Sequence, residues 1–133
     1  MASIHKDIPV DAHPDAVWDA VRDFGAVHQR LNPGFVTDCR LDGNTRIVTF
    51  HNGHVVPEEF VDCDEARRRL VYAIVSERVA HYSAAVQVFD AGPGRSQVSW
   101  IVDVLPNDIA PYISGQMDLG VLAIQKAFVG TTA

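Results

Sequence analysis

The chain of 133 residues is long enough for one domain with a substantial core and too short for two. Its formal net charge of -6 disfavours nonspecific binding to nucleic acid or to an anionic membrane, because both depend on clustered Lys and Arg. No stretch approaches the roughly 20 apolar residues that span a bilayer, and the N-terminus has no signal-peptide pattern. We therefore expect a single cytoplasmic domain over residues 1–133, without a nucleic-acid partner and without membrane insertion.

The chain opens with a predicted strand and two short helices. Residues 3–10 indicate a strand, and Pro14 fits the first position of the helix that follows. Gly25 ends this helix. Residues 26–31 predict a second short helix, which the next Asn-Pro-Gly sequence terminates. Two helices set at an angle are therefore expected, rather than one rod.

Consecutive strands with turn sequences between them fill the middle of the chain. Turns such as Asp42-Gly43 and Asn52-Gly53 separate short runs that suit strands. The predicted strands cover residues 35–42, 45–51, 54–63, 68–76, 82–90 and 95–105. Because neighbouring strands are joined by short turns, an antiparallel sheet is expected.

The last part of the chain predicts one long helix. From Asn107 to Phe128, apolar residues recur at three- and four-residue spacing over about six turns. A helix with a full apolar stripe must pack on another element, here the sheet. The stripe holds Gly120 and the flexible Met117, where tight packing favours Leu or Ile. This composition predicts a gap between helix and sheet in which a small molecule can lie.

Strand register can be tested by asking which pairing gathers apolar residues on one face. In the last hairpin, pairing Val86 with Trp100 does so, and it places Tyr82 opposite Val104. The same test on the preceding hairpin sets Tyr72 beside Val86. Both tyrosines and Trp100 should then point toward the long helix, with polar tips that need partners.

The strand over residues 54–63 leaves two alternatives. One places Val56, Glu58 and Phe60 toward the cavity, and the other places Val55, Pro57, Glu59 and Val61 there. Val48 and Phe50 fit the second alternative better, and a β-bulge would satisfy both. In either case a carboxylate can point inward, where it is costly unless it is paired or protonated.

The order of these elements and several sequence phrases resemble the START-like, helix-grip superfamily (SRPBCC), which includes polyketide cyclases/dehydrases and lipid-transfer domains. The phrases span Ile8 to Trp18, Asp23 to Ala26, Asn32 to Gly34, Arg68 to Tyr72 and Trp100 to Pro106, and the resemblance covers nearly the whole chain. It implies an α+β helix-grip fold: a seven-stranded antiparallel sheet wrapped around the C-terminal helix, with two short helices after the first strand. It also implies a cavity that opens near those helices. The superfamily includes carriers, receptors and enzymes, so the resemblance does not select a function.

By position, the resemblance implies a set of residues on the cavity wall, any of which can instead be ordinary core. They are Trp18, Phe24, Leu31, Phe35, Phe50, Tyr72, Tyr82, Val86, Trp100, Met117, Gly120, Val121 and Ile124.

Four residues are candidate acid–base groups near such a cavity: His28, His81, Glu58 and Glu59. A histidine at a cavity rim titrates near neutral pH, although an exposed or hydrogen-bonded histidine is the simpler interpretation. His51 and His54 flank a tight turn without a carboxylate-rich loop, so no metal site is expected. The sequence contains no cofactor motif, and none is expected.

Two functions remain. The first is binding or transport of a small hydrophobic molecule, such as a lipid-like, polyketide or aromatic metabolite, by a monomer or homodimer. It needs a cavity and one or two orienting polar groups. The alternative is a polyketide aromatase/cyclase or dehydratase, in which a glutamate, a histidine and Tyr72 or Tyr82 move protons on a bound ketone. Tyr112 and Gln116 can add hydrogen bonds at one end of the cavity in either case.

Overall fold

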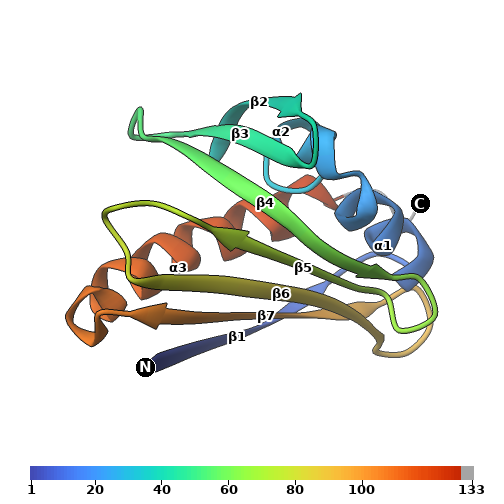
Figure 1. Cartoon of the computed structure of the whole chain (residues 1–133). Coiled ribbons are helices and arrows are strands. Elements are labelled where there is room, and N and C mark those ends of the chain that lie inside the picture. Colours follow the sequence, from blue (N-terminus) through green and yellow to red (C-terminus); the bar gives the residue numbers. More distant parts are fainter. Residues whose placement is uncertain (130–133) are drawn as a thin grey trace.

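Seven strands form one antiparallel sheet in the order β1-β7-β6-β5-β4-β3-β2, and the long helix α3 lies against one face of it (Figure 1). The computed structural model describes residues 1–129, so the last four residues of the predicted domain lie outside the described part. The strands are β1 Ala2–Val10, β2 Val36–Asp42, β3 Thr45–Phe50, β4 Val55–Asp64, β5 Arg69–Ile74, β6 His81–Asp90 and β7 Ser96–Leu105. The predicted helix-grip fold is confirmed.

The two short helices follow β1, as predicted. Helix α1 (Pro14–Arg22) begins with Pro14 in its first turn, and the His13 side chain accepts a hydrogen bond from a backbone N–H of that turn. A single 3₁₀ turn at Phe24–Ala26 leads into α2 (Val27–Arg30). Helix α1 lies at the end of the sheet where the β4–β5 and β6–β7 turns are, and α2 lies beside β2 (Figure 1).

The C-terminal helix begins with a 3₁₀ turn at Asn107–Ile109 and continues as α3 (Ala110–Ala127). It buries Met117, Gly120 and Ile124 against the sheet, so the predicted apolar stripe is confirmed. No helix within residues 1–129 combines the length and apolar character that crossing a membrane requires.

The β6–β7 register agrees with the prediction, whereas the β5–β6 register differs by two residues. Val86 lies opposite Trp100, as expected. Tyr72, however, lies opposite Ala84 rather than Val86. The chain reverses at Ser76–Val79, which form an isolated bridge, and this turn comes earlier than predicted. Because side chains alternate with a period of two, a shift of two residues leaves every predicted face unchanged.

Strand β4 turns Val56 and Glu58 toward the helix. Glu58 is buried, and Val56 lies opposite the buried Val48 of β3. The alternative with Val55 and Glu59 inward is wrong, since Val55 is exposed on the other face and Glu59 is exposed too. The anticipated bulge is present further along, between Phe60 and Asp62, and it leaves Phe60 and Val61 partly exposed.

Candidate functional site

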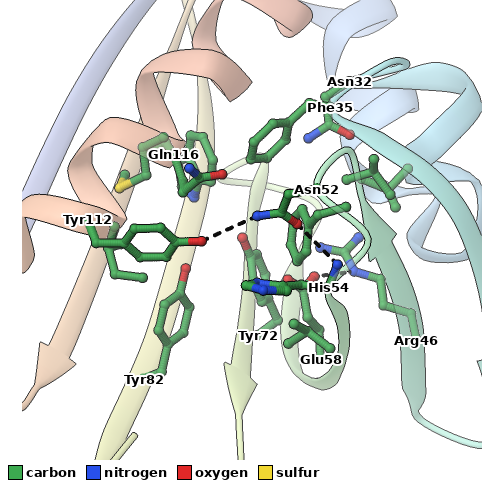
Figure 2. Close-up of a pocket in the computed structure, with 17 residues that line it drawn as sticks. Asn32, Phe35, Arg46, Asn52, His54, Glu58, Tyr72, Tyr82, Tyr112 and Gln116 are labelled. Atoms are coloured by element: carbon green, nitrogen blue, oxygen red, sulfur yellow. Dashed lines mark hydrogen bonds and ion pairs between the residues drawn. The ribbon is translucent and has the colours of Figure 1, made fainter. Parts of the chain in front are cut away.

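A cavity of about 140 Å³ lies between the sheet and the first half of α3 (Figure 2). Its volume is close to the roughly 150 Å³ of an apolar cavity that holds benzene. Most of its surface is aromatic or aliphatic. The lining residues are Val27, Asn32, Phe35, Val36, Arg46, Phe50, Asn52, His54, Val56, Glu58, Tyr72, Tyr82, Trp100, Tyr112, Ile113, Gln116 and Met117.

A buried ion pair forms the polar part of the wall. Arg46 of β3 and Glu58 of β4 lie directly opposite one another, and Arg46 Nε donates to Glu58 Oε1 at 2.8 Å. Their exposed fractions are 4% and 5%. Two charges removed from water this completely are tolerated because each is the partner of the other.

Two aromatic rings contact the Arg46 guanidinium. Its central carbon lies 4.2 Å from the Phe24 ring centroid and 4.8 Å from the Tyr72 ring centroid. Arg46 Nη1 also donates to the Phe24 backbone carbonyl at 3.3 Å. Such cation–π contacts strengthen when they are desolvated, so the two rings help to stabilise the buried positive charge.

Tyr72 and Tyr82 supply two neutral hydroxyl groups. Burial raises the pKa of Tyr72, and the negative charge of Glu58 raises it further; Arg46 and the nearby Trp100 indole oppose this effect. Burial likewise raises the pKa of Tyr82, with added contributions from Tyr72 and Glu58. Tyr82 is half-buried by its exposed surface, and the protein around its ring accounts for the direction of this shift in pKa. Both hydroxyls stay protonated at neutral pH and can donate hydrogen bonds.

Two further polar atoms are buried on the lining side chains without a hydrogen bond. They are Trp100 Nε1 and Asn32 Oδ1, and neither has a partner in bonding geometry within residues 1–129. The Trp100 indole lies near enough to the Tyr72 hydroxyl to affect its pKa, but the geometry is not that of a hydrogen bond. A buried polar group left unpaired costs about 1–3 kcal/mol.

The β3–β4 turn reaches across to α3 beside the cavity. Asn52 Nδ2 donates to the Tyr112 hydroxyl at 3.3 Å, as Figure 2 shows, and His51 Nε2 lies 3.1 Å from Gln116 Oε1. The exposed lining residues, among them Asn52, His54 and Tyr112, mark the opening here. Val27 of α2 also lines the cavity and is buried, and an opening near the short helices stays a prediction.

Six of the predicted lining residues lie on the cavity wall. They are Phe35, Phe50, Tyr72, Tyr82, Trp100 and Met117. Seven others do not line it: Trp18, Phe24, Leu31, Val86, Gly120, Val121 and Ile124. Leu31, Val86 and Ile124 are buried in the core, and Val121 is partly buried against it.

Specific contacts explain three of these differences. The Trp18 indole donates to Glu65 Oε1 at 2.9 Å, away from the cavity. Phe24 packs edge-on against Phe60 and lies behind Arg46. The gap predicted at Gly120 is filled, because a Cβ atom there would lie 2.8 Å from the Trp100 ring.

Of the four acid–base candidates, Glu58 alone belongs to the lining. Glu59 is exposed, on the opposite face of β4. His81 Nε2 lies 3.2 Å from Ser83 Oγ, and the half-buried His28 has an Nδ1 atom without a partner among the described residues. His54, which the sequence suggested only for metal binding, lies at the opening.

Sequence reasoning missed several lining residues, above all Arg46. The sequence did contain a signal for it. Arg46, Val48 and Phe50 occupy alternate positions of β3, so the alternation that predicts an inward Val48 also predicts an inward Arg46. The other residues missed are Val27, Asn32, Val36, Asn52 and Ile113. Nothing in the sequence signalled the burial of Asn32.

Comparison with known proteins agrees with the fold. Residues 1–128 match the family described as polyketide cyclase / dehydrase and lipid transport. The solved structure of XoxI from Bacillus cereus superposes with a TM-score of 0.85 at 20% identity, covering 100% of this chain and 99% of that one. A START superfamily protein from Mycobacterium smegmatis gives 0.73 at 16% identity, with coverage of 98% and 96%.

A truncated norcoclaurine synthase from Thalictrum flavum gives a TM-score of 0.73 at 22% identity, covering 97% of this chain and 94% of that one. At these identities the structural likeness establishes the fold alone. No curated protein matches the sequence. The family match, which spans nearly the whole chain, shows that this protein belongs to the polyketide cyclase/dehydrase and lipid transport family.

Proposed function

We propose that the protein binds a small, largely apolar molecule in the cavity between α3 and the sheet. The observation that carries this proposal is a cavity of about 140 Å³ walled by Phe35, Phe50, Trp100 and Met117. Concave sites with mostly apolar walls and a few placed polar groups are typical of small-molecule binding. The family's description, which includes lipid transport, supports the same class of function.

The size of the cavity limits what it holds without rearrangement. A volume near that of a benzene-binding cavity suits a single ring or a short chain. A longer lipid-like or polyketide ligand needs the β3–β4 turn to move away from α3. That movement breaks the Asn52–Tyr112 and His51–Gln116 contacts, both of which are exposed side-chain interactions.

Acid–base catalysis on a bound ketone is the second candidate, and one observation favours it. Glu58 and the protonated Tyr72 and Tyr82 hydroxyls belong to one cavity, which offers a carboxylate and two proton donors. Catalysis requires acid and base to meet at one substrate atom, whereas Arg46 already holds one oxygen of Glu58. Binding needs no such convergence and is therefore the first proposal.

Native mass spectrometry of the purified protein tests the binding proposal. We expect a bound apolar molecule, retained in the spectrum and identified by its mass after denaturation. Ile113→Trp, which fills the cavity, should abolish this binding. The matched control is Val75→Trp, because Val75 is 67% exposed and lies outside the cavity.

If the purified protein carries no ligand, the same comparison is made with added toluene. Equal binding by Ile113→Trp and Val75→Trp would contradict the proposal. A ligand recovered chemically changed after incubation would instead favour the catalytic candidate.

A further inference from the structure

Glu58 Oε2 and the Tyr82 hydroxyl are among the polar atoms of the cavity residues that no hydrogen bond reaches within residues 1–129. Glu58 Oε1 accepts from Arg46, but within residues 1–129 no hydrogen bond reaches Glu58 Oε2. The Tyr82 hydroxyl also has no hydrogen-bond partner in this part of the chain. Both residues line the cavity, and Figure 2 shows Tyr72 between them.

The free carboxylate oxygen selects for a hydrogen-bond donor. An ionised carboxylate only accepts hydrogen bonds, and bonds from a hydroxyl to a carboxylate are among the strong ones. The Tyr82 hydroxyl can either donate or accept. A hydroxyl group on the ligand suits both kinds of partner, since a hydroxyl can donate to a carboxylate oxygen and accept from a tyrosine hydroxyl.

Charge on the ligand is disfavoured in both directions. An anion would lie beside the negative charge of Glu58, and the lining arginine, Arg46, already pairs its charge with that carboxylate. The other basic lining residue, His54, is exposed at the opening. A cation would lose its hydration on entering the cavity. The carboxylate that it would meet there is already paired with Arg46, so the loss would not be compensated.

We propose that the cavity takes a phenol: an uncharged, single-ring ligand whose hydroxyl donates to Glu58 Oε2 and accepts from Tyr82. The aromatic walls and the volume of about 140 Å³ fit one ring. This inference rests on the proposed binding function and adds the ligand class to it.

Isothermal titration calorimetry with four one-ring probes tests the inference: toluene, phenol, benzoate and benzylamine, all at neutral pH. We expect phenol to bind at least about tenfold more tightly than toluene, because a hydrogen bond to a charged group contributes enough free energy for that difference in affinity. Benzoate and benzylamine should bind more weakly than phenol.

The outcomes separate the inference from the function beneath it. Toluene binding as tightly as phenol overturns the inference and leaves the binding function intact. Tighter binding of either charged probe also overturns it. Failure of all four probes to bind overturns both proposals.

The double variant Arg46→Met/Glu58→Leu removes the ion pair while keeping the volume apolar, a replacement that buried pairs often tolerate. It should lose the preference for phenol over toluene. The matched control is Arg22→Met/Glu65→Leu, because that ion pair, 3.0 Å long, lies on the surface away from the cavity. The control should keep the preference.

Tyr82→Phe provides a test that does not disturb the ion pair. It should lower the ratio of phenol affinity to toluene affinity several-fold, since only the hydroxyl is lost. An undiminished phenol preference in both the double variant and Tyr82→Phe would overturn the assignment.

Discussion

Arg46 and Glu58 face one another across β3 and β4, with 2.8 Å between Arg46 Nε and Glu58 Oε1, and both side chains are almost completely buried. The pair is a buried ion pair in a cavity wall made largely of rings and aliphatic groups. Arg46 holds Glu58 in place, and the negative charge of Glu58 helps to raise the pKa of Tyr72 and of Tyr82.

Breaking this pair should destabilise the protein strongly. Glu58→Ala leaves Arg46 charged and buried without its partner, so we expect a loss of about 3–5 kcal/mol in the free energy of unfolding. Urea denaturation followed by circular dichroism measures it. Arg46→Met/Glu58→Leu should recover most of the loss, because neither charge then remains. A double variant as unstable as Glu58→Ala would refute this explanation.

The two glycines of α3 should respond oppositely to alanine. A Cβ atom at Gly115 meets nothing within 4 Å, so Gly115→Ala should stabilise by about 1 kcal/mol through helix propensity. At Gly120, a Cβ atom would lie 2.8 Å from the Trp100 ring and 3.3 Å from Phe35. Gly120→Ala should therefore cost about 1–3 kcal/mol of overpacking, less the propensity gain.

Denaturation curves of the two glycine variants, recorded side by side, check this prediction. Trp100 fluorescence should also change in Gly120→Ala and not in Gly115→Ala. Equal stabilisation by both substitutions would mean that Trp100 moves freely and that the space beside Gly120 is not filled.

Alkaline pH should unfold the protein through its buried tyrosines. The pKa values of Tyr72 and Tyr82 lie above the ordinary value of 10, so both phenols remain protonated in the folded state while the unfolded chain ionises. Their contribution to stability is therefore complete below pH 10 and decreases as the pH rises beyond it. Tyrosinate absorbance should show both ionising together with unfolding.

Variants show how much each tyrosine contributes to the absorbance change at alkaline pH. Tyr72→Phe and Tyr82→Phe should each remove part of the absorbance change that accompanies unfolding. Ionisation of either tyrosine well before loss of the circular dichroism signal would contradict its burial.

Acid pH should reduce the stability of the protein through the surface ion pair of Arg22 and Glu65. A hydrogen bond from Arg22 lowers the pKa of Glu65, assisted by the charge of Arg22 and by the Trp18 indole. The folded-state pKa thus lies below the ordinary 4.5, and the associated stability is present above that value and lost as the pH falls through the folded-state pKa.

Arg22→Ala should raise the pKa of Glu65 toward 4.5, which a carboxyl-detected NMR titration measures. Arg30→Ala is the matched control, because Arg30 instead lowers the pKa of Asp19. A Glu65 titration that is unchanged in Arg22→Ala would show that Arg22 does not hold this carboxylate.

The fold was predictable because its determinants are periodic. Alternation placed Tyr72, Tyr82 and Trp100 on the correct face even where the β5–β6 register was displaced by two residues. The same alternation along β3 would have identified Arg46 as the partner that Glu58 needs.

The cavity itself was less predictable, because it depends on which side chains fill the space. A glycine on a helix stripe either leaves a hole or admits a neighbouring ring, and the sequence does not distinguish these at Gly120. The contact between Trp18 and Glu65 joins α1 to the β4–β5 turn across 47 positions, which no local pattern indicates. Positions of individual lining residues therefore required the structure.

Methyl NMR of the two methionines tests the binding proposal most directly. Met117 lines the cavity at 2% exposure, whereas Met1 is 62% exposed and lies outside it, so one labelled sample contains its own control. On titration with toluene, we predict a saturable shift of the Met117 methyl signal, no shift at Met1, and no response of Met117 in Ile113→Trp. A Met117 signal that stays fixed at saturating toluene, or that moves equally in Ile113→Trp, would contradict the assignment of this cavity as a ligand site.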